Sequence, residues 1–231
     1  MKSKFNLFNK RVITGLFIFL FISFNIISAQ KLRFGVFADP VISWFSSDTR
    51  ETQSKGARAG FNFGFILDKY FSENYAFSTG LNILNAGGQL VNNVPVEMEF
   101  KNMQASVLAG NAVIYKIQYL SIPLGLKFNS NQIGYIRFFT DMGIDPKIVI
   151  GGKVDIPSLD IIGESALNEL HLANMSYHIN GGIEYSMGGN TSLIFGLGFD
   201  NNFLDITKEN GTQPVDKISH KIVKFHFGVN F

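Results

Sequence analysis

Side chains that could support catalysis or metal binding are few and widely separated in this sequence of 231 residues. It has four histidines and no cysteine, and the histidines lack the local spacing typical of metal ligands. His178, His226 and Glu184 are the side chains that could serve as a base and an orienting acid for a serine nucleophile. No serine lies in a defining motif, and both histidines fall in the middle of apolar, alternating segments. We therefore expect no catalytic, cofactor or metal site.

Charged side chains form a second set, and they recur at alternate positions of the same apolar segments. Large apolar residues occupy the other face of each segment, so the charges share one face. We expect a polar network of Arg33, Arg58, Lys127, Arg137, Asp141, Glu184, Asp200 and Lys224, together with the acids Asp39 and Asp145. Equal numbers of cations and acids indicate mutual pairing, because an unpaired buried charge is costly.

The elements that must position these charges are β-strands. Every second residue from Val223 to Phe231 is apolar, and the residues between them are polar or glycine. A period of two with one apolar face and one polar face is typical of a strand between two different environments. The pattern predicts eight strands in all, over residues 31–39, 58–67, 75–83, 119–128, 136–145, 177–185, 191–200 and 221–231.

The connections between these segments alternate between long and short. Short turn signals occur at 72–74, 129–132 and 188–190. Longer polar loops are predicted near 46–51 and over 87–111, 151–174 and 205–219, with a short helix at Glu164–Leu172. This alternation predicts an all-β fold, an eight-stranded antiparallel transmembrane β-barrel of the outer-membrane type with short periplasmic turns and long external loops.

A soluble eight-stranded barrel of the lipocalin type is the alternative, with its apolar face turned inward. The faces with large apolar residues hold almost no charge, and the opposite faces hold nearly all of it. Turning the sheet inside out would therefore either place the charges in lipid or leave two dozen apolar side chains in water. A barrel with the charges on the lipid face is excluded, because each Arg or Lys there costs about 2–4 kcal/mol. The predicted location is therefore the cell outer membrane, with the apolar face in contact with lipid.

The start of the chain is typical of an export signal. Met1–Arg11 carries four cations and no acid, Val12–Phe24 is almost wholly apolar, and Ser28 and Ala29 supply small residues for cleavage. We expect a signal peptide at residues 1–29 and a barrel domain at 30–231. Without those four cations, 16 Lys and Arg remain against 18 Asp and Glu, a net charge of −2. The apparent basicity thus indicates no nucleic-acid partner.

Eight strands leave an interior just wide enough for side chains to fill it. We therefore expect a plugged polar interior and a non-enzymatic protein that is structural or binds a partner through external loops such as Phe100–Met103. A lipid-modifying enzyme and a narrow channel are the alternatives. The expected partners are outer-membrane lipid, the barrel-assembly machinery through the C-terminal strand ending at Phe231, and an envelope protein.

One segment carries a family resemblance. Tyr119–Phe128, reading YLSIPLGLKF, resembles the Y-x-x-I-P-x-x-x-K strand of the PorT-like family of outer-membrane β-barrel proteins. The resemblance implies an eight-stranded barrel without a common catalytic site. It also opens a further alternative, an accessory role in protein secretion and gliding as in the family's namesake. Pro123 removes a donor from the strand, so we expect a bulge there.

Overall fold

The computed structural model describes residues 31–100, 103–208 and 213–231, and the predicted signal peptide lies outside them. Within those residues, no helix has the length and apolar character needed to span a membrane. The described elements are β1 (Leu32–Ser47), β2 (Thr52–Ser72), β3 (Tyr75–Asn92), β4 (Val96–Glu99), β5 (Gln104–Val107), β6 (Ala112–Ser121), β7 (Leu124–Asn129), β8 (Ile136–Ile156), η1 (Pro157–Leu159), β9 (Ile161–Ser165), η2 (Leu167–Glu169), β10 (Ala173–Gly188), β11 (Thr191–Asn202) and β12 (Ile218–Asn230), where η denotes a single 3₁₀ turn.

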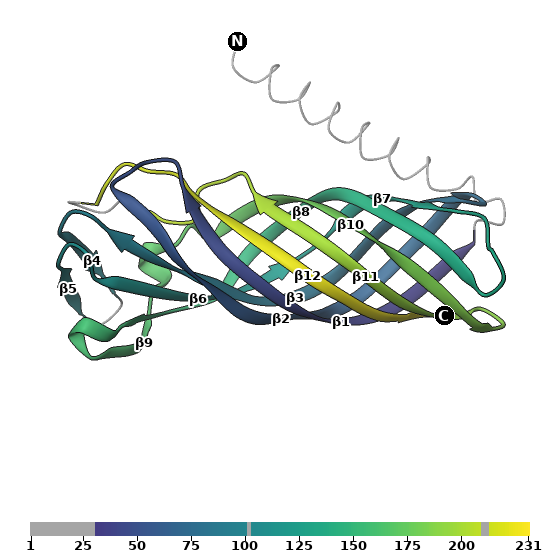
Figure 1. The fold of residues 1–231 in the computed structure, drawn as a ribbon, viewed down its shortest axis with the longest axis horizontal. Coiled ribbons are helices and arrows are strands. Elements are labelled where there is room, and N and C mark those ends of the chain that lie inside the picture. Colours follow the sequence, from purple (N-terminus) through teal and green to yellow (C-terminus); the bar gives the residue numbers. More distant parts are fainter. Residues whose placement is uncertain (1–30, 101–102, 209–212) are drawn as a thin grey trace, which may run out of the picture. The chain divides into compact units, whose positions relative to one another are not determined.

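The long strands form a closed ring, because β1 pairs with both β2 and β12. Pairing continues from β2 to β3, and from β8 through β10 and β11 back to β12. β6 and β7 both lie between β3 and β8, so together they fill one position in the ring. All of these pairings are antiparallel, and they give eight positions (Figure 1). The predicted eight-stranded antiparallel barrel is confirmed.

The fourth position in the ring is interrupted at Ile122 and Pro123, between β6 and β7. Proline has no N–H group to donate to the ladder. The Ile122 N–H donates instead to the Pro146 carbonyl at 3.1 Å. Leu124 follows Ser121 by three positions, and their respective partners on both β3 and β8 are also three positions apart. The ladder is therefore interrupted without an inserted residue, and the expected bulge at Pro123 is absent.

Large apolar side chains gather on the outer surface, on the strand portions nearest the short turns. We call this surface the apolar band; it includes Phe34, Val36, Phe61, Phe63, Phe65, Phe77, Leu124, Leu126, Phe138, Met142, Ile144, Ile179, Phe195, Leu197, Phe225 and Phe227, all exposed. Between them in sequence, Arg33, Lys127 and Glu184 are buried. The apolar residues thus face outward and the charges inward, as the alternation predicts.

Most strands extend far beyond the predicted segments. β1 continues to Ser47, β2 begins at Thr52, β3 continues to Asn92 and β8 continues to Ile156. The loop predicted over 87–111 contains the end of β3 and the hairpin of β4 and β5, which lies at the opposite end of the barrel from the C-terminus (Figure 1). This end carries the long connections, and we call it the extracellular end.

The helix predicted at Glu164–Leu172 is wrong. β9 ends at Ser165 and pairs with β8, and only the single turn η2 follows at Leu167–Glu169. The Ala166 N–H donates to the Gly152 carbonyl at 3.0 Å, which ties this segment to β8. The local sequence has enough helix formers for a turn, but pairing with the extended β8 determines its conformation.

The strand extensions were missed because the two faces exchange their character along each strand. In β6 the inward side chains are apolar and buried, namely Val113, Tyr115, Ile117 and Tyr119. Its outward positions include Lys116 and Gln118. Beyond the apolar band the outer surface meets water rather than lipid, so the apolar face turns to the interior. A pattern that keeps apolar residues outward therefore stops at the band.

Candidate functional site

The interior at the level of the apolar band holds a first group of buried ion pairs around Glu184. Its Oε2 accepts from Arg33 Nη1 at 2.8 Å, and its Oε1 accepts from Lys127 Nζ at 2.7 Å. Lys127 Nζ also donates to Asp68 Oδ2 at 2.8 Å, and Arg33 Nη2 donates to Ser192 Oγ at 2.9 Å. These residues come from β1, β2, β7, β10 and β11, so the group links five strands across the interior.

A second group surrounds Asp200 on β11. Asp200 Oδ1 lies 2.7 Å from Lys224 Nζ, and Asp200 Oδ2 lies 3.5 Å from Lys147 Nζ. Lys147 and Asp68 were not among the predicted network residues. Each lies just past the end of a predicted segment, at the next position of the same alternation. Extending segments 136–145 and 58–67 by one or two residues would have found both.

The two mid-strand histidines are held by carboxylates. His178 Nδ1 lies 2.8 Å from Asp145 Oδ1, and His178 Nε2 lies 3.3 Å from Asp141 Oδ2. His226 Nδ1 lies 2.8 Å from Asp39 Oδ1. Both ring nitrogens of His178 thus face a carboxylate, and neither faces a serine hydroxyl. Among the described residues, these contacts link β10 to β8 and β12 to β1.

Arg137 is less well paired than the network prediction implies. It lies opposite Glu184 in the pairing of β8 with β10. Glu184 already binds Arg33 and Lys127. The buried Arg137 Nε has no hydrogen-bond partner among the described residues. Arg137 therefore borders the Glu184 group without joining it.

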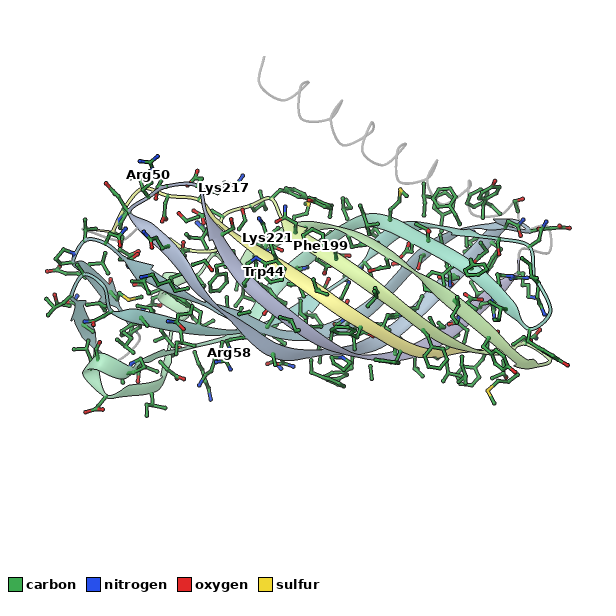
Figure 2. The ribbon with its side chains drawn as sticks, viewed as in Figure 1. Trp44, Arg50, Arg58, Phe199, Lys217 and Lys221 are labelled. Carbon is green, nitrogen blue, oxygen red and sulfur yellow. The ribbon has the colours of Figure 1, made fainter. Side chains whose placement is uncertain are left out.

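Arg58 lies on the outer surface, so the prediction that it faces the interior was wrong. Between Ala57 and Phe61, β2 contains one residue more than the facing segment of β3, which is a β-bulge. A bulge disrupts the alternation and redirects a side chain. A Cβ on Gly87 would lie 3.2 Å from Arg58 Cδ, and Figure 2 shows Arg58 projecting away from the strands. Counting alternate positions cannot detect an inserted residue.

Towards the extracellular end the interior is apolar, so the prediction of a polar interior holds only at the level of the apolar band. The upper cluster, as we call it, includes Val41, Phe45, Leu84, Ala86, Leu90, Val113, Tyr115, Ile117, Tyr119, Val154, Ile156, Ile206, Ile218 and Ile222. His220 is buried within it and lies 3.2 Å from the Tyr119 hydroxyl through Nδ1. The barrel interior is therefore filled by paired charges at the level of the apolar band and by apolar side chains towards the extracellular end.

The extracellular connections pack onto the upper cluster rather than standing free of it. Val96, Met98 and Val107 of the β4–β5 hairpin belong to the same buried cluster. Buried Glu169 on η2 accepts the Glu99 N–H at 2.7 Å, and its Oε2 accepts from Gln213 at 2.6 Å. One carboxylate thus joins three connections into a cap. No motif in the sequence marks Glu169 for this role, because its partners come from distant segments.

The remaining internal space is small. A cavity of about 60 Å³ lies between the ion-pair groups, and Asp39, Asp141, His178 and Lys224 are among its lining residues. That volume accommodates only a few water molecules. In the described part of the chain, no group of three or more His, Cys, Asp or Glu side chains is arranged to hold a metal ion.

Comparison with known protein families gives one match. A model of the family described as outer membrane protein beta-barrel domain matches residues 28–208. Neisserial surface protein A is 13% identical, with a TM-score of 0.49 over 85% of this chain and 95% of that one. OprG of Pseudomonas aeruginosa is 12% identical, with a TM-score of 0.44 over 87% and 97%. The protease OmpT of Escherichia coli is 9% identical, with a TM-score of 0.44 over 90% and 99%. No curated protein matches the sequence.

Proposed function

Because the chain belongs to the family of outer membrane protein beta-barrel domains and is located in the cell outer membrane, we propose that it is a closed, non-conducting barrel that presents its extracellular end to a partner. The observation that carries this proposal is the filled interior. Ion pairs around Glu184 and Asp200 occupy the level of the apolar band, and the upper cluster occupies the rest. An ion would have to displace buried, paired charges and then cross an apolar plug, and both steps are costly.

Under this proposal the protein has no enzymatic activity. A general base needs a free nitrogen within hydrogen-bond reach of the group that it deprotonates. His178 directs both ring nitrogens at carboxylates, His226 directs Nδ1 at Asp39, and Glu184 is held between two cations. The buried His220 meets Tyr119 inside the upper cluster, where no substrate has access. These contacts support a stabilising role for each candidate catalytic residue.

The proposed working surface is the extracellular cap. Glu169 fixes three connections, so the cap presents a defined surface rather than separate loops. Large apolar side chains are exposed there, at Leu108, Ile162 and Val215, with exposed fractions of 63%, 82% and 78%. A rigid scaffold that carries function on its connections is the usual arrangement in small barrels.

Conductance in planar lipid bilayers tests the closed barrel. The folded wild-type chain should give no conductance steps, and stable steps would overturn the proposal. The double variant Phe45→Ala/Ile222→Ala removes buried side chains from the upper cluster and should raise the frequency of brief openings. Phe225→Ala/Phe227→Ala removes outward side chains of the apolar band and serves as the matched control.

Partner binding is tested separately by photo-crosslinking. A crosslinking amino acid at Ile162 or Leu108 in the native envelope should give one discrete adduct. The same amino acid at Ile179, in the apolar band, should give only lipid adducts. Absence of a protein adduct at both extracellular positions would contradict the partner-binding role while leaving the closed barrel intact.

We also propose a second role, that of a secretion accessory, on the likeness of Tyr119–Phe128 to the PorT-like strand. The motif lies across the junction of β6 and β7, because the strand is interrupted at Pro123. This position supports a structural role for the proline that the chain shares with the PorT-like strand. Under this proposal the crosslinked partner is a component of a protein-export apparatus. Mass-spectrometric identification of the adduct distinguishes it from a structural envelope protein.

A further inference from the structure

The bulge in β2 reshapes the outer wall of the barrel above the apolar band. Between Ala57 and Phe61 the strand is not paired with β3, although it stays paired with β1. Ser43 of β1 reaches across this gap and hydrogen-bonds to the backbone of Gly87 on β3. β2 can therefore bow away from β3 without leaving those backbone groups unpaired, and Arg58 is carried to the outer surface (Figure 2).

A groove of about 430 Å³ follows from this deformation. Its floor is the outer face of β3, β6 and β8, one wall is the bulged part of β2, and the other wall is formed by Ser165 and Leu167 after β8. This volume is within the range of small-molecule sites. A flat sheet would offer no such recess, so the groove depends on both the inserted residue and the folded-back β9 segment.

Three cations lie along the groove. Lys116 on β6 and Lys153 on β8 are direct cross-strand partners, and Arg58 packs over Gly87, the partner of Lys116 on β3. Because Gly87 has no side chain, Arg58 can lie next to Lys116. Together they form a row that we call the cation row.

The acid beside the cation row is Asp155. It forms an ion pair with Lys116 and accepts the Gly163 N–H at 2.8 Å. Burial by itself would raise the pKa of Asp155, but these hydrogen bonds and attraction to Lys116 and Arg58 lower it. Asp155 therefore stays ionised and offsets one of the three positive charges. Arg58 makes no hydrogen bond or ion pair with the described residues.

From the cation row towards the apolar band, the side chains on the floor of the groove are first amides and then apolar residues. Asn85 and Gln118 are cross-strand partners two residues closer to the band. Two residues further along the same strands lie Ile83 and Leu120, and Leu120 pairs with Ile148, which is 50% exposed. Each step of two residues is about 6.6 Å along a strand. The order from lipid to water is thus apolar, amide, cationic, over about 13 Å of strand.

From this order we propose that the groove binds the phosphorylated sugar headgroup of a lipid in the outer leaflet. The phosphate is held by Arg58, Lys116 and Lys153, because guanidinium and ammonium groups bind phosphate oxygens strongly. Sugar hydroxyls hydrogen-bond to Asn85 and Gln118, since amides both donate and accept. The acyl chains lie on the apolar band below. A water-soluble phosphate would make no contact with the apolar side chains of Ile83, Leu120 and Ile148. Their position below the cations therefore favours a lipid as the occupant.

Lipid retention measured by native mass spectrometry tests the site. The full chain is reconstituted in nanodiscs of phosphatidylcholine doped with a phosphorylated glucosamine-disaccharide lipid, and then released into the gas phase. The wild-type protein should retain that lipid, and the variant Arg58→Gln/Lys116→Gln/Lys153→Gln should lose about tenfold or more of the retained lipid, since each surface cation contributes attraction to anionic headgroups. The same lipid without phosphate should be retained no better by the wild type than by the variant.

The matched control neutralises three exposed cations at the same end of the barrel, Arg50→Gln/Lys55→Gln/Lys217→Gln. Its retention should equal that of the wild type. Equal retention by the groove variant and the control would overturn the proposal. A water-soluble glucosamine phosphate that displaces the lipid at equal concentration would overturn the choice of a lipid. A shift between unboiled and boiled samples on a gel confirms that both variants are folded barrels. None of these outcomes depends on whether the barrel conducts.

Discussion

Ser43 Oγ makes two hydrogen bonds to the backbone of a single residue, Gly87. It donates to the Gly87 carbonyl oxygen at 2.7 Å and accepts the Gly87 N–H at 2.9 Å. The two residues belong to β1 and β3, which are separated in the ring by β2. The hydroxyl thus takes the place of the β2 backbone where β2 bulges outward. This one side chain allows the barrel to remain closed while its outer wall is deformed.

Replacing Ser43 by alanine should destabilise the barrel by about 1–3 kcal/mol, because the buried Gly87 N–H would lose its partner. The Gly87 carbonyl retains a contact with His220 Nε2 at 3.3 Å, so the loss falls mainly on the N–H. Urea unfolding in lipid vesicles, followed by fluorescence of the single tryptophan Trp44, measures the change. Ser46→Ala, at a partly exposed position of the same strand, should leave the unfolding midpoint unchanged.

Replacing Lys127 by methionine should cost about 3–5 kcal/mol, because Asp68 and Glu184 would be left as buried carboxylates with too few cations. Lys127 contacts both at 2.7–2.8 Å, and its side chain is 5% exposed. The free energy of unfolding in urea reports the loss. The double variant Lys127→Met/Asp68→Asn removes one of the two unpaired carboxylates and should recover part of the lost free energy of unfolding. If the double variant were as unstable as the single one, the ion pairs would not be the source of stability.

Replacing Gly182 by alanine should destabilise the barrel by about 1–3 kcal/mol through overpacking. A Cβ at this inward position would overlap the Phe195 carbonyl oxygen and lie 2.6 Å from Gly196 Cα. Both are backbone atoms of the paired strand β11, which cannot move aside cheaply. The neighbouring Gly181 provides the control, because its Cβ would come no closer than 3.7 Å to an atom of a facing residue, the Phe139 carbonyl oxygen. Gly181→Ala should fold as efficiently as the wild type, and equal folding yields for the two variants would contradict this account.

The extracellular loop that carries Asp216 should become more stable in mild acid. Burial and repulsion from Asp205 and Asp48 raise the pKa of Asp216. An acid with a raised pKa in the folded state destabilises that state when ionised, and the penalty disappears as the pH falls through the raised pKa towards the ordinary value of about 3.9. Hydrogen exchange of the backbone near Asp216, corrected for intrinsic rates, should therefore slow with falling pH.

Asp216→Asn should abolish this pH dependence, since the amide carries no charge. The Ser47 hydroxyl, which donates to Asp216 Oδ2 at 3.4 Å, can donate equally to the amide oxygen. Asp160→Asn alters an exposed acid in another connection and should leave the pH dependence intact. An unchanged pH dependence in Asp216→Asn would show that another group controls the loop.

The alternation of apolar and polar residues is sufficient to predict the architecture at the level of the apolar band. Alternation from Val223 to Phe231 and in seven other segments was enough to predict eight antiparallel strands, the lipid-facing side and most of the interior charges. This succeeds because a strand places successive side chains on opposite faces, and because lipid outside and packed charges inside impose opposite demands on them. Asp68 and Lys147 follow the same alternation, but the predicted segments ended one or two residues before them.

Three features follow only from the three-dimensional fold: which charges form pairs, where the interior changes from polar to apolar, and the outward direction of Arg58. Glu184 binds Arg33 and Lys127 because the register of the ring brings β1, β7 and β10 together at one level, and alternation carries no information on register. The upper cluster forms where the outside of the barrel changes from lipid to water, and the sequence does not mark that boundary. Arg58 lies outside because one inserted residue in β2 is accommodated by Ser43 on another strand, a compensation that exists only in three dimensions.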